Sequence, residues 1–217
     1  MSSTPSHGSD PRMRAMLRLA PVIPVYSPQS AEEAIQVARA LIKGGLPVIE
    51  VTLRTPQALD AIAAITEQVP DMVVGAGTVL TPDQLLAVQQ AGARFAVSPG
   101  ATDALYWGAR DTGLPLLPGV ATASEIQRGL EHGVDTFKFF PAVPAGGTAM
   151  LSAWAGPFRD VRFCPTGGIA PATAREFLRQ PNVLCVGGSW LTPGDAISAG
   201  QWDILSGLAA QAAALAG

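Results

Sequence analysis

The chain alternates short runs of consecutive apolar residues with longer stretches of amphipathic, helical periodicity. Runs that are apolar at successive positions are typical of parallel strands covered by helices. Ser30 and Thr122 stand where helices should begin, and Gly92 and Gly113 where helices should end. The predicted strands cover 21–26, 47–53, 72–78, 94–99, 115–120, 135–141, 161–168 and 183–189. The predicted helices cover 30–44, 56–69, 82–92, 102–112, 122–132, 147–155, 171–179 and about 199–215.

Eight successive β–α units predict an α/β fold, a closed (β/α)8 or TIM barrel with a short N-terminal helix. A doubly wound open sheet is the alternative. No linker or low-complexity segment divides the chain, so residues 13–217 are expected to form one domain. Residues 1–12 are polar and lack the apolar segment of a signal peptide, so we expect a disordered tail there.

The composition restricts the possible partners. Apolar residues make up 48% of the chain and charged residues 14%, below the usual share of about a quarter. This balance predicts a large core and a buried subunit interface. The net charge of −3 and the lack of a basic run argue against nucleic acid as a partner. No apolar stretch approaches about 18 uninterrupted residues, so no membrane span is expected.

Candidate metal ligands are few. Cys164 and Cys185 both lie within apolar strands, where we expect reduced core residues of a cytoplasmic protein. The two histidines, His7 and His132, lie in the tail and at a helix end, and there is no Cys-x-x-Cys motif. No metal and no cofactor is therefore expected, although carboxylates alone could hold Mg²⁺.

Only two lysines occur in the chain, and one of them lies inside a predicted strand. Lys43 ends a helix, where a cation is ordinary. Lys138 is flanked by phenylalanines in DTFKFFPA, and burial there disfavours the ammonium and leaves a fraction of free amine. A shielded amine attacks ketones to form a Schiff base, and Phe140, on the same strand face, would wall its pocket. The alternative is a lysine that reaches the surface or pairs with a carboxylate.

The second predicted strand carries a carboxylate and ends at a guanidinium. Helices should cover the face of Ile49 and Val51, so Glu50, on the other face, should point into the barrel. A carboxylate in that position is costly unless it is paired or catalytic. Arg54 has a planar fork suited to a carboxylate ligand. A structural Glu50–Arg54 ion pair is the alternative, although four residues of strand span about 13 Å.

Glycines end three of the predicted strands, on the side where barrel enzymes place their sites. The third strand ends in GAGT (75–78), and its Thr78 offers a hydroxyl. Glycine pairs follow the seventh and eighth strands, in PTGGI (165–169) and VGGSW (186–190). Such pairs at these two strands are typical of a phosphate site made of backbone N–H groups, with ordinary tight turns as the alternative.

These residues predict a single chemistry. The lysine would form an imine with a ketone, the glutamate would move protons, and the arginine and threonine would hold a carboxylate. The glycines would hold a phosphate. The expected substrate is a phosphorylated 2-keto acid, whose imine at C2 withdraws electrons during cleavage of the C3–C4 bond.

At these positions the chain resembles the bacterial 2-dehydro-3-deoxy-phosphogluconate aldolases, class I aldolases of the Entner–Doudoroff pathway. The resemblance covers about residues 21–193 and implies cleavage to pyruvate and glyceraldehyde 3-phosphate, with activity on 4-hydroxy-2-oxoglutarate as well. It also implies a cytoplasmic homotrimer. The departures are a longer polar tail and the loop PAVPAGG (141–147). The matching motifs are IEVTLRT (49–55), VGAGTVL (74–80), FAVSPG (95–100), FKFFPA (137–142), GPFRDVRFCPTGGI (156–169) and VLCVGGSWL (183–191).

The resemblance implies roles for single residues. Lys138 would be the Schiff-base residue and Glu50 the general acid and base. An isomerase or synthase that uses Glu50 as a base without an imine, and a non-catalytic oligomeric scaffold, are the competing hypotheses. The implied binding residues are Arg54 and Thr78 for the carboxylate, Thr166 beside the imine, Pro99 at the pocket wall, and Gly167, Gly168, Gly188 and Ser189 for the phosphate.

Overall fold

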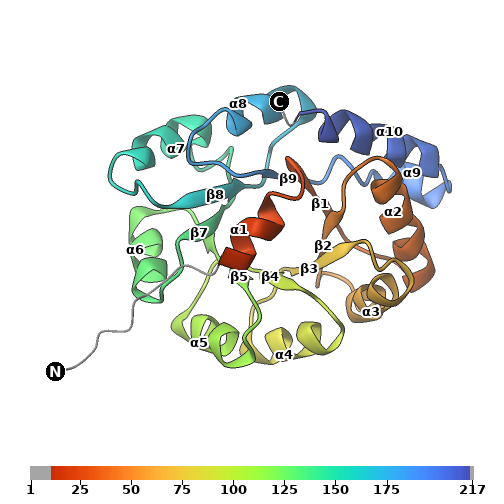
Figure 1. Cartoon of the computed structure of the whole chain (residues 1–217), viewed down its shortest axis with the longest axis horizontal. Coiled ribbons are helices and arrows are strands. Elements are labelled where there is room, and N and C mark those ends of the chain that lie inside the picture. Colours follow the sequence, from red (N-terminus) through yellow and green to blue (C-terminus); the bar gives the residue numbers. More distant parts are fainter. Residues whose placement is uncertain (1–10, 216–217) are drawn as a thin grey trace.

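The computed structural model describes residues 11–215, in which parallel strands gather at the centre and helices surround them (Figure 1). The predicted tail falls mostly on residues 1–10, which lie outside the described residues. The strands are β1 Val22–Tyr26, β2 Val48–Thr52, β3 Val73–Gly77, β4 Phe95–Val97, β5 Leu116–Leu117, β6 Gly119–Val120, β7 Thr136–Phe139, β8 Arg162–Pro165 and β9 Val186–Gly188. The helices are α1 Pro11–Leu17, α2 Ala31–Lys43, α3 Ala58–Gln68, α4 Pro82–Gln90, α5 Asp103–Thr112, α6 Ala123–Glu131, α7 Gly147–Ala155, α8 Pro171–Leu178, α9 Gly194–Ser198 and α10 Trp202–Ala213.

Capping contacts confirm three of the predicted helix boundaries. The Ser30 side chain accepts a hydrogen bond from the backbone N–H of Glu33 at 3.1 Å, which satisfies a donor that α2 itself cannot pair. Thr122 and Glu125 form a capping box at the start of α6. Gly113 ends α5 in the left-handed region, with a φ of 69°. Local sequence signals therefore place these helices correctly.

The prediction of a closed eight-stranded barrel was wrong, although the α/β class and the parallel pairing are confirmed. The strands form a six-stranded sheet, in the order β5-β4-β3-β2-β1-β9, and a three-stranded sheet, in the order β6-β7-β8. The predicted strand 115–120 divides at Pro118, which has no N–H to donate, and β5 and β6 join different sheets. Between β8 and β9 the structure has only isolated bridges, Phe163 with Val183 and Thr166 with Gly187.

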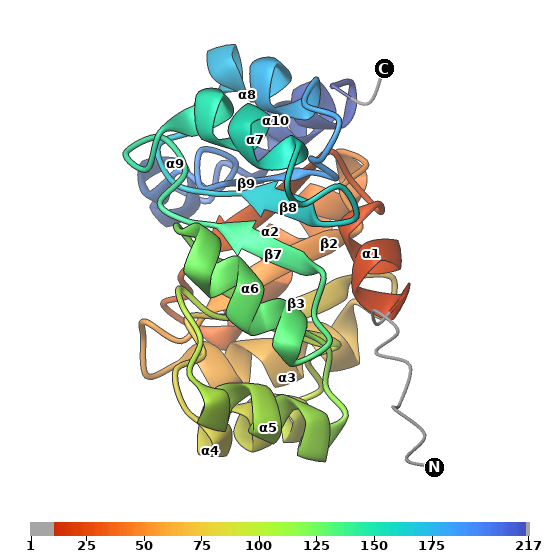
Figure 2. The ribbon, with the colours of Figure 1, turned by 90° about the vertical axis from the view of Figure 1, so that its left-hand side faces the viewer.

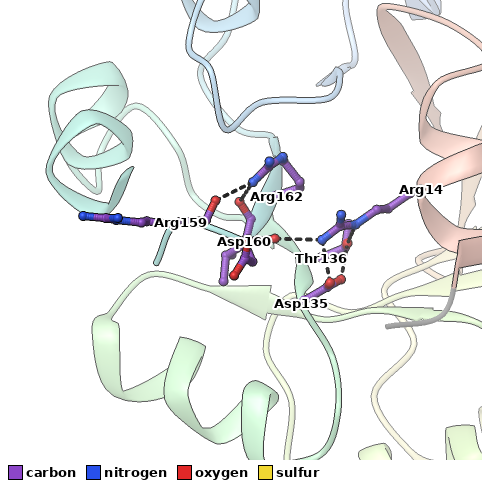
Figure 3. A network of polar contacts seen from close by, with 7 residues as sticks. Arg14, Asp135, Thr136, Arg159, Asp160 and Arg162 are labelled. Atoms are coloured by element: carbon purple, nitrogen blue, oxygen red, sulfur yellow. Dashed lines mark hydrogen bonds and ion pairs between the residues drawn. The ribbon is translucent and has the colours of Figure 1, made fainter. Parts of the chain in front are cut away.

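Helix α1 closes the end from which the strands start (Figure 2). Its Arg14 donates to the Asp135 carboxylate, to Thr136 Oγ1 at 3.2 Å and to the Asp160 carbonyl at 2.7 Å (Figure 3). These three partners stand at the beginnings of β7 and β8. Arg14 and Asp135 are both largely buried, with side chains 23% and 21% exposed, so the bonds tie α1 firmly to the smaller sheet.

Candidate active site

Lys138 of β7 and Glu50 of β2 meet inside the molecule. The lysine Nζ lies 3.0 Å from Glu50 Oε1 and 3.5 Å from Oε2. Their side chains are 6% and 5% exposed, so the two charges compensate each other away from water. Glu50 therefore points inward, as strand parity predicts, and its partner is Lys138 rather than Arg54. A proton that leaves the ammonium has an acceptor at hydrogen-bond distance.

Glycines provide the space for this pair and for its surroundings. A Cβ on Gly77, in the adjacent strand, would lie 2.3 Å from Glu50 Oε1. A Cβ on Gly75 would lie 2.1 Å from the Phe95 ring. Both glycines are therefore required by close approach, and only side-chain packing reveals it. On the other side, the Phe140 ring centroid lies 5.3 Å from Lys138 Nζ, so this ring borders the amine.

Cys164 lies in β8, next to the lysine strand, and Thr166 follows just after it. Cys164 is in register with Lys138, and Thr166 Oγ1 donates to the Cys164 carbonyl at 3.5 Å. Gly187 of β9 leaves room for Thr166, because a Cβ there would lie 2.3 Å from its Oγ1. Thr166 is only 7% exposed and so belongs to the interior. Burial, and after it the hydrogen bond with Cys164, raises the pKa of the Cys185 thiol, which keeps it uncharged.

The two residues predicted to hold a carboxylate lie at the rim. Arg54 is exposed in the turn after β2, and within residues 11–215 it makes no ion pair or hydrogen bond. Thr78 is half-buried after β3 and has a φ of 60°, which is unusual for a residue with a Cβ. Such strained positions persist where the surrounding structure holds them, and they gather at functional sites. The sequence gives no sign of this conformation.

The predicted phosphate residues gather after β8 and β9. Gly167 and Gly168 have φ values of 101° and 79°, a backbone conformation that residues with a Cβ rarely adopt. Successive N–H groups in such a turn can form a site for an anion. The bridge between Thr166 and Gly187 brings the two glycine turns side by side. Ser189 is exposed beside them.

Two residues predicted for the site, Gly188 and Pro99, also take part in close packing contacts. A Cβ on Gly188 would lie 2.3 Å from the Trp190 ring, so this glycine makes room for the tryptophan. Pro99 is exposed at the end of β4, and its carbonyl oxygen lies 2.1 Å from where a Cβ on Gly119 would be. A bulky residue at position 188 would therefore disturb Trp190 first, and it is a poor probe of a phosphate site.

Sequence reasoning gave no role to a pair of hydroxyl groups above Glu50. Ser27 Oγ and Thr52 Oγ1 lie 2.7 Å apart, and Thr52 is completely buried. Val25 is paired with Glu50 in register, so residues two further along each strand fall on the same inner face. Parity applied to Thr52 as well as Glu50 would have found one member. Ser27 follows the end of β1, where pattern alone does not indicate direction.

A cavity of about 510 Å³ lies elsewhere, between α5, α6 and the start of α1. Its lining includes Tyr106, Trp107 and His132, and none of the predicted site residues. It opens at the end of the strands opposite to the glycine turns. Within the described part of the chain, no group of three or more His, Cys, Asp or Glu side chains could hold a metal. None of the described helices is long and apolar enough to cross a membrane.

A parallel α/β fold with a buried lysine–glutamate pair has the arrangement of an imine-forming enzyme. The chain belongs to the KDPG and KHG aldolase family, which it matches over residues 13–208. It is 52% identical over 198 residues to the KHG/KDPG aldolase of Escherichia coli K12, covering 91% of this chain and 93% of that one. It is 50% identical over 194 residues to the 2-dehydro-3-deoxy-phosphogluconate aldolase of Pseudoalteromonas atlantica, covering 89% and 90%.

Solved structures agree with this family. The KDPG aldolase of Legionella pneumophila, with pyruvate captured at low pH as a covalent carbinolamine intermediate, is 47% identical with a TM-score of 0.90. The alignment covers 92% of this chain and 97% of that one. The Zymomonas mobilis ZM4 enzyme, solved with 3-phosphoglycerate, is 48% identical with a TM-score of 0.87, covering 93% and 94%.

Proposed function

We propose that the protein is a class I aldolase that cleaves 2-dehydro-3-deoxy-6-phosphogluconate to pyruvate and glyceraldehyde 3-phosphate. The observation that carries this proposal is the buried contact of 3.0 Å between Lys138 Nζ and Glu50 Oε1. A lysine held in this way can deliver a neutral amine, because its proton has a neighbouring acceptor. The covalent pyruvate intermediate of the Legionella pneumophila relative supports the same chemistry.

The reaction begins when the Lys138 amine attacks C2 of the keto acid and forms a carbinolamine. Loss of water gives the imine, and Glu50 carries the protons that this step requires. Glu50 then accepts the proton of the C4 hydroxyl while the C3–C4 bond breaks. The bonding electrons move into the imine, so that glyceraldehyde 3-phosphate leaves and an enamine of pyruvate remains. Protonation at C3 and hydrolysis release pyruvate and restore the amine.

The binding roles in this proposal are those that the resemblance to the family implies. Arg54 and Thr78 hold the carboxylate at C1, and Thr166 stands beside the imine with Phe140 as a wall. Supporting observations are the half-buried, strained Thr78 and the buried Thr166 hydroxyl. The phosphate is bound by backbone N–H groups of the glycine turns and by Ser189, and Pro99 shapes the opposite rim. The residues in this phosphate site are Gly167, Gly168, Gly188 and Ser189.

Three further properties belong to the same proposal. Activity on 4-hydroxy-2-oxoglutarate is supported by relatives that carry both substrates in their names. A homotrimer is what the resemblance to the family implies, and the apolar composition supports association between copies. A cytoplasmic location is supported by two free, buried cysteines, Cys164 and Cys185.

Reductive trapping tests the proposal directly. Borohydride added with pyruvate should reduce the imine and leave a stable pyruvyl group on Lys138, located by peptide mass spectrometry. Lys138→Arg should give no adduct, because a guanidinium stays protonated and cannot attack a ketone. Lys43 is the matched control, since it is the other lysine and pairs with Asp203 on the exposed surface. Label on Lys43, or none at all, would contradict the assignment and favour an isomerase or synthase without an imine.

A further inference from the structure

A small polar cavity of about 220 Å³ lies between the end of β1 and the segment that follows β9. Ser27, Ser189 and Thr192 line it together with Glu33. Tyr26 Oη and the backbone N–H of Gln29 both donate to the Glu33 carboxylate, which is thereby held in place. No lysine or arginine lines this cavity. Ser189 is shared with the proposed phosphate site, and the part of the cavity beside the fixed Glu33 carboxylate suits a neutral hydroxyl better than a phosphate, which the carboxylate would repel.

The order of the strands places Ser27 between the two ends of the proposed substrate. In the larger sheet β1 stands between β9 and β2. The proposed phosphate residues follow β8 and β9, whereas Glu50, the acceptor for the C4 hydroxyl, belongs to β2. A chain bound from the phosphate at C6 to the oxygen at C4 must pass β1 with its C5 carbon. Ser27, the first residue after that strand, carries a hydroxyl, whereas the hydroxyl of Tyr26, the last residue of the strand, already donates to Glu33.

The partner of Ser27 orients its hydroxyl. Thr52 is fully buried, and Ser27 Oγ, at 2.7 Å, is its only hydrogen-bond partner among the described side-chain contacts. A buried hydroxyl without an acceptor is costly, so the stable arrangement has Thr52 donating to Ser27. Ser27 then accepts from Thr52 and keeps its own proton for a group in the cavity. Thr52 is in this sense a positioning residue and does not touch the substrate.

We propose that Ser27, oriented by Thr52, donates a hydrogen bond to the C5 hydroxyl of the substrate and so selects aldehydes that carry a hydroxyl next to the carbonyl. This inference rests on the proposed function. In the direction of synthesis, the C5 hydroxyl is the hydroxyl at C2 of glyceraldehyde 3-phosphate. Its removal from the aldehyde leaves both the phosphate and the pyruvate imine unchanged.

The test pairs two aldehydes with two enzymes. Condensation of saturating pyruvate with glyceraldehyde 3-phosphate is compared with condensation with 3-oxopropyl phosphate, which lacks the hydroxyl. Ser27→Ala should lower kcat/KM about 3- to 10-fold for glyceraldehyde 3-phosphate, the effect of one neutral hydrogen bond, and leave the deoxy aldehyde nearly unchanged. Thr52→Val should show the same dependence on the hydroxyl, and Thr52→Ser should restore the parent behaviour. Ser198→Ala, in the same cavity, is the matched control and should change neither.

The outcomes separate this inference from the function on which it rests. An equal loss with both aldehydes, or no loss with either, would overturn the role of Ser27. A Thr52→Val protein that keeps the parent's preference would overturn the orienting role of Thr52. Failure of the parent enzyme to condense either aldehyde, or to form a borohydride adduct with pyruvate, would instead overturn the aldolase itself.

Discussion

At the scale of the residue, the chemistry proposed for this protein depends on the pairing of one lysine with one glutamate. Each would be expensive alone in an interior where both side chains are about 95% covered, as exposures of 6% and 5% imply. Together they share a proton that can pass between the lysine amine and the glutamate carboxylate. The contact joins residues 88 positions apart in the chain, so it exists only in the folded protein.

The first prediction concerns proton transfer. Glu50→Gln keeps the shape of the side chain and removes its basicity, so kcat for cleavage should fall about 10²- to 10⁴-fold. Imine formation with pyruvate should persist at a reduced rate, because the Lys138 amine is still present. Steady-state kinetics and borohydride trapping on the same preparation measure the two effects. A variant with the parent's kcat would show that Glu50 serves only to compensate the charge of Lys138.

The second prediction concerns the carboxylate. Arg54→Lys keeps the charge but loses the planar fork, so pyruvate should bind more weakly and KM for pyruvate should rise. Arg54 makes no ion pair with residues 11–215, so the substitution should leave the unfolding free energy unchanged. Arg39→Lys, exposed on α2, is the control. Parent-like affinity for pyruvate in Arg54→Lys would assign the arginine to another purpose.

At the scale of the element, α1 packs Met13 and Leu17 into the core, and its Arg14 bonds to the strand starts of the smaller sheet. Arg14 bonds to the beginnings of β7 and β8, and β7 carries Lys138 at its other end. Arg14→Ala removes the cation that pairs with Asp135. It should therefore lower the unfolding free energy by about 1.5–3 kcal/mol, the usual contribution of hydrogen bonds to charged groups. Urea denaturation measures this change in the unfolding free energy. Arg18→Ala is the control, because Arg18 is exposed just after α1, and equal stability of the two variants would contradict the claim.

An exposed ion cluster gives α5 and α6 a dependence on pH. Arg128 Nε and Nη2 donate to the two Asp103 carboxylate oxygens at 2.9 and 2.8 Å, and His132 Nε2 lies 2.9 Å from one of these oxygens. The Arg128 and His132 bonds lower the pKa of Asp103 to about 2. A carboxyl group whose pKa is lowered by folding stabilises the fold at pH values above its ordinary pKa near 4. This stabilisation is lost as the pH falls towards 2. The stability advantage of the parent over Asp103→Asn should therefore disappear across this range in melting experiments.

At the scale of the whole molecule, the chain has few charged residues and many apolar ones, and contacts between copies can bury part of the apolar surface. We expect light scattering to give three times the chain mass of 22.3 kDa at micromolar concentration. The reason is that burial of further apolar surface between copies is favourable and scales with area. A mass equal to one chain would contradict the homotrimer without affecting the imine chemistry, provided that the monomer still forms the pyruvate adduct.

The arrangement of the whole molecule also shows where the prediction from sequence patterns is wrong. Each of the eight predicted strand ranges contains a strand, yet the closed barrel is not formed. Pro118 ends β5 and lets β6 pair with β7, and Pro165 ends β8 without an N–H for its neighbour. The prolines are visible in the sequence, but which neighbour each strand chooses depends on packing across the interior. Helix α9 was not predicted either, because five residues carry too little periodicity.

The sequence by itself determined the order of the longer strands and helices, several helix caps, and the residue types of the candidate site. These depend on local propensity, periodicity and spacing, and they can be read along the chain. Only the tertiary structure decided that Lys138 lies against Glu50, that Thr52 lies at hydrogen-bond distance from Ser27, and that Gly188 makes room for Trp190. The physical reason is that each of these contacts depends on the three-dimensional direction and packing of side chains, and short-range pattern does not encode either.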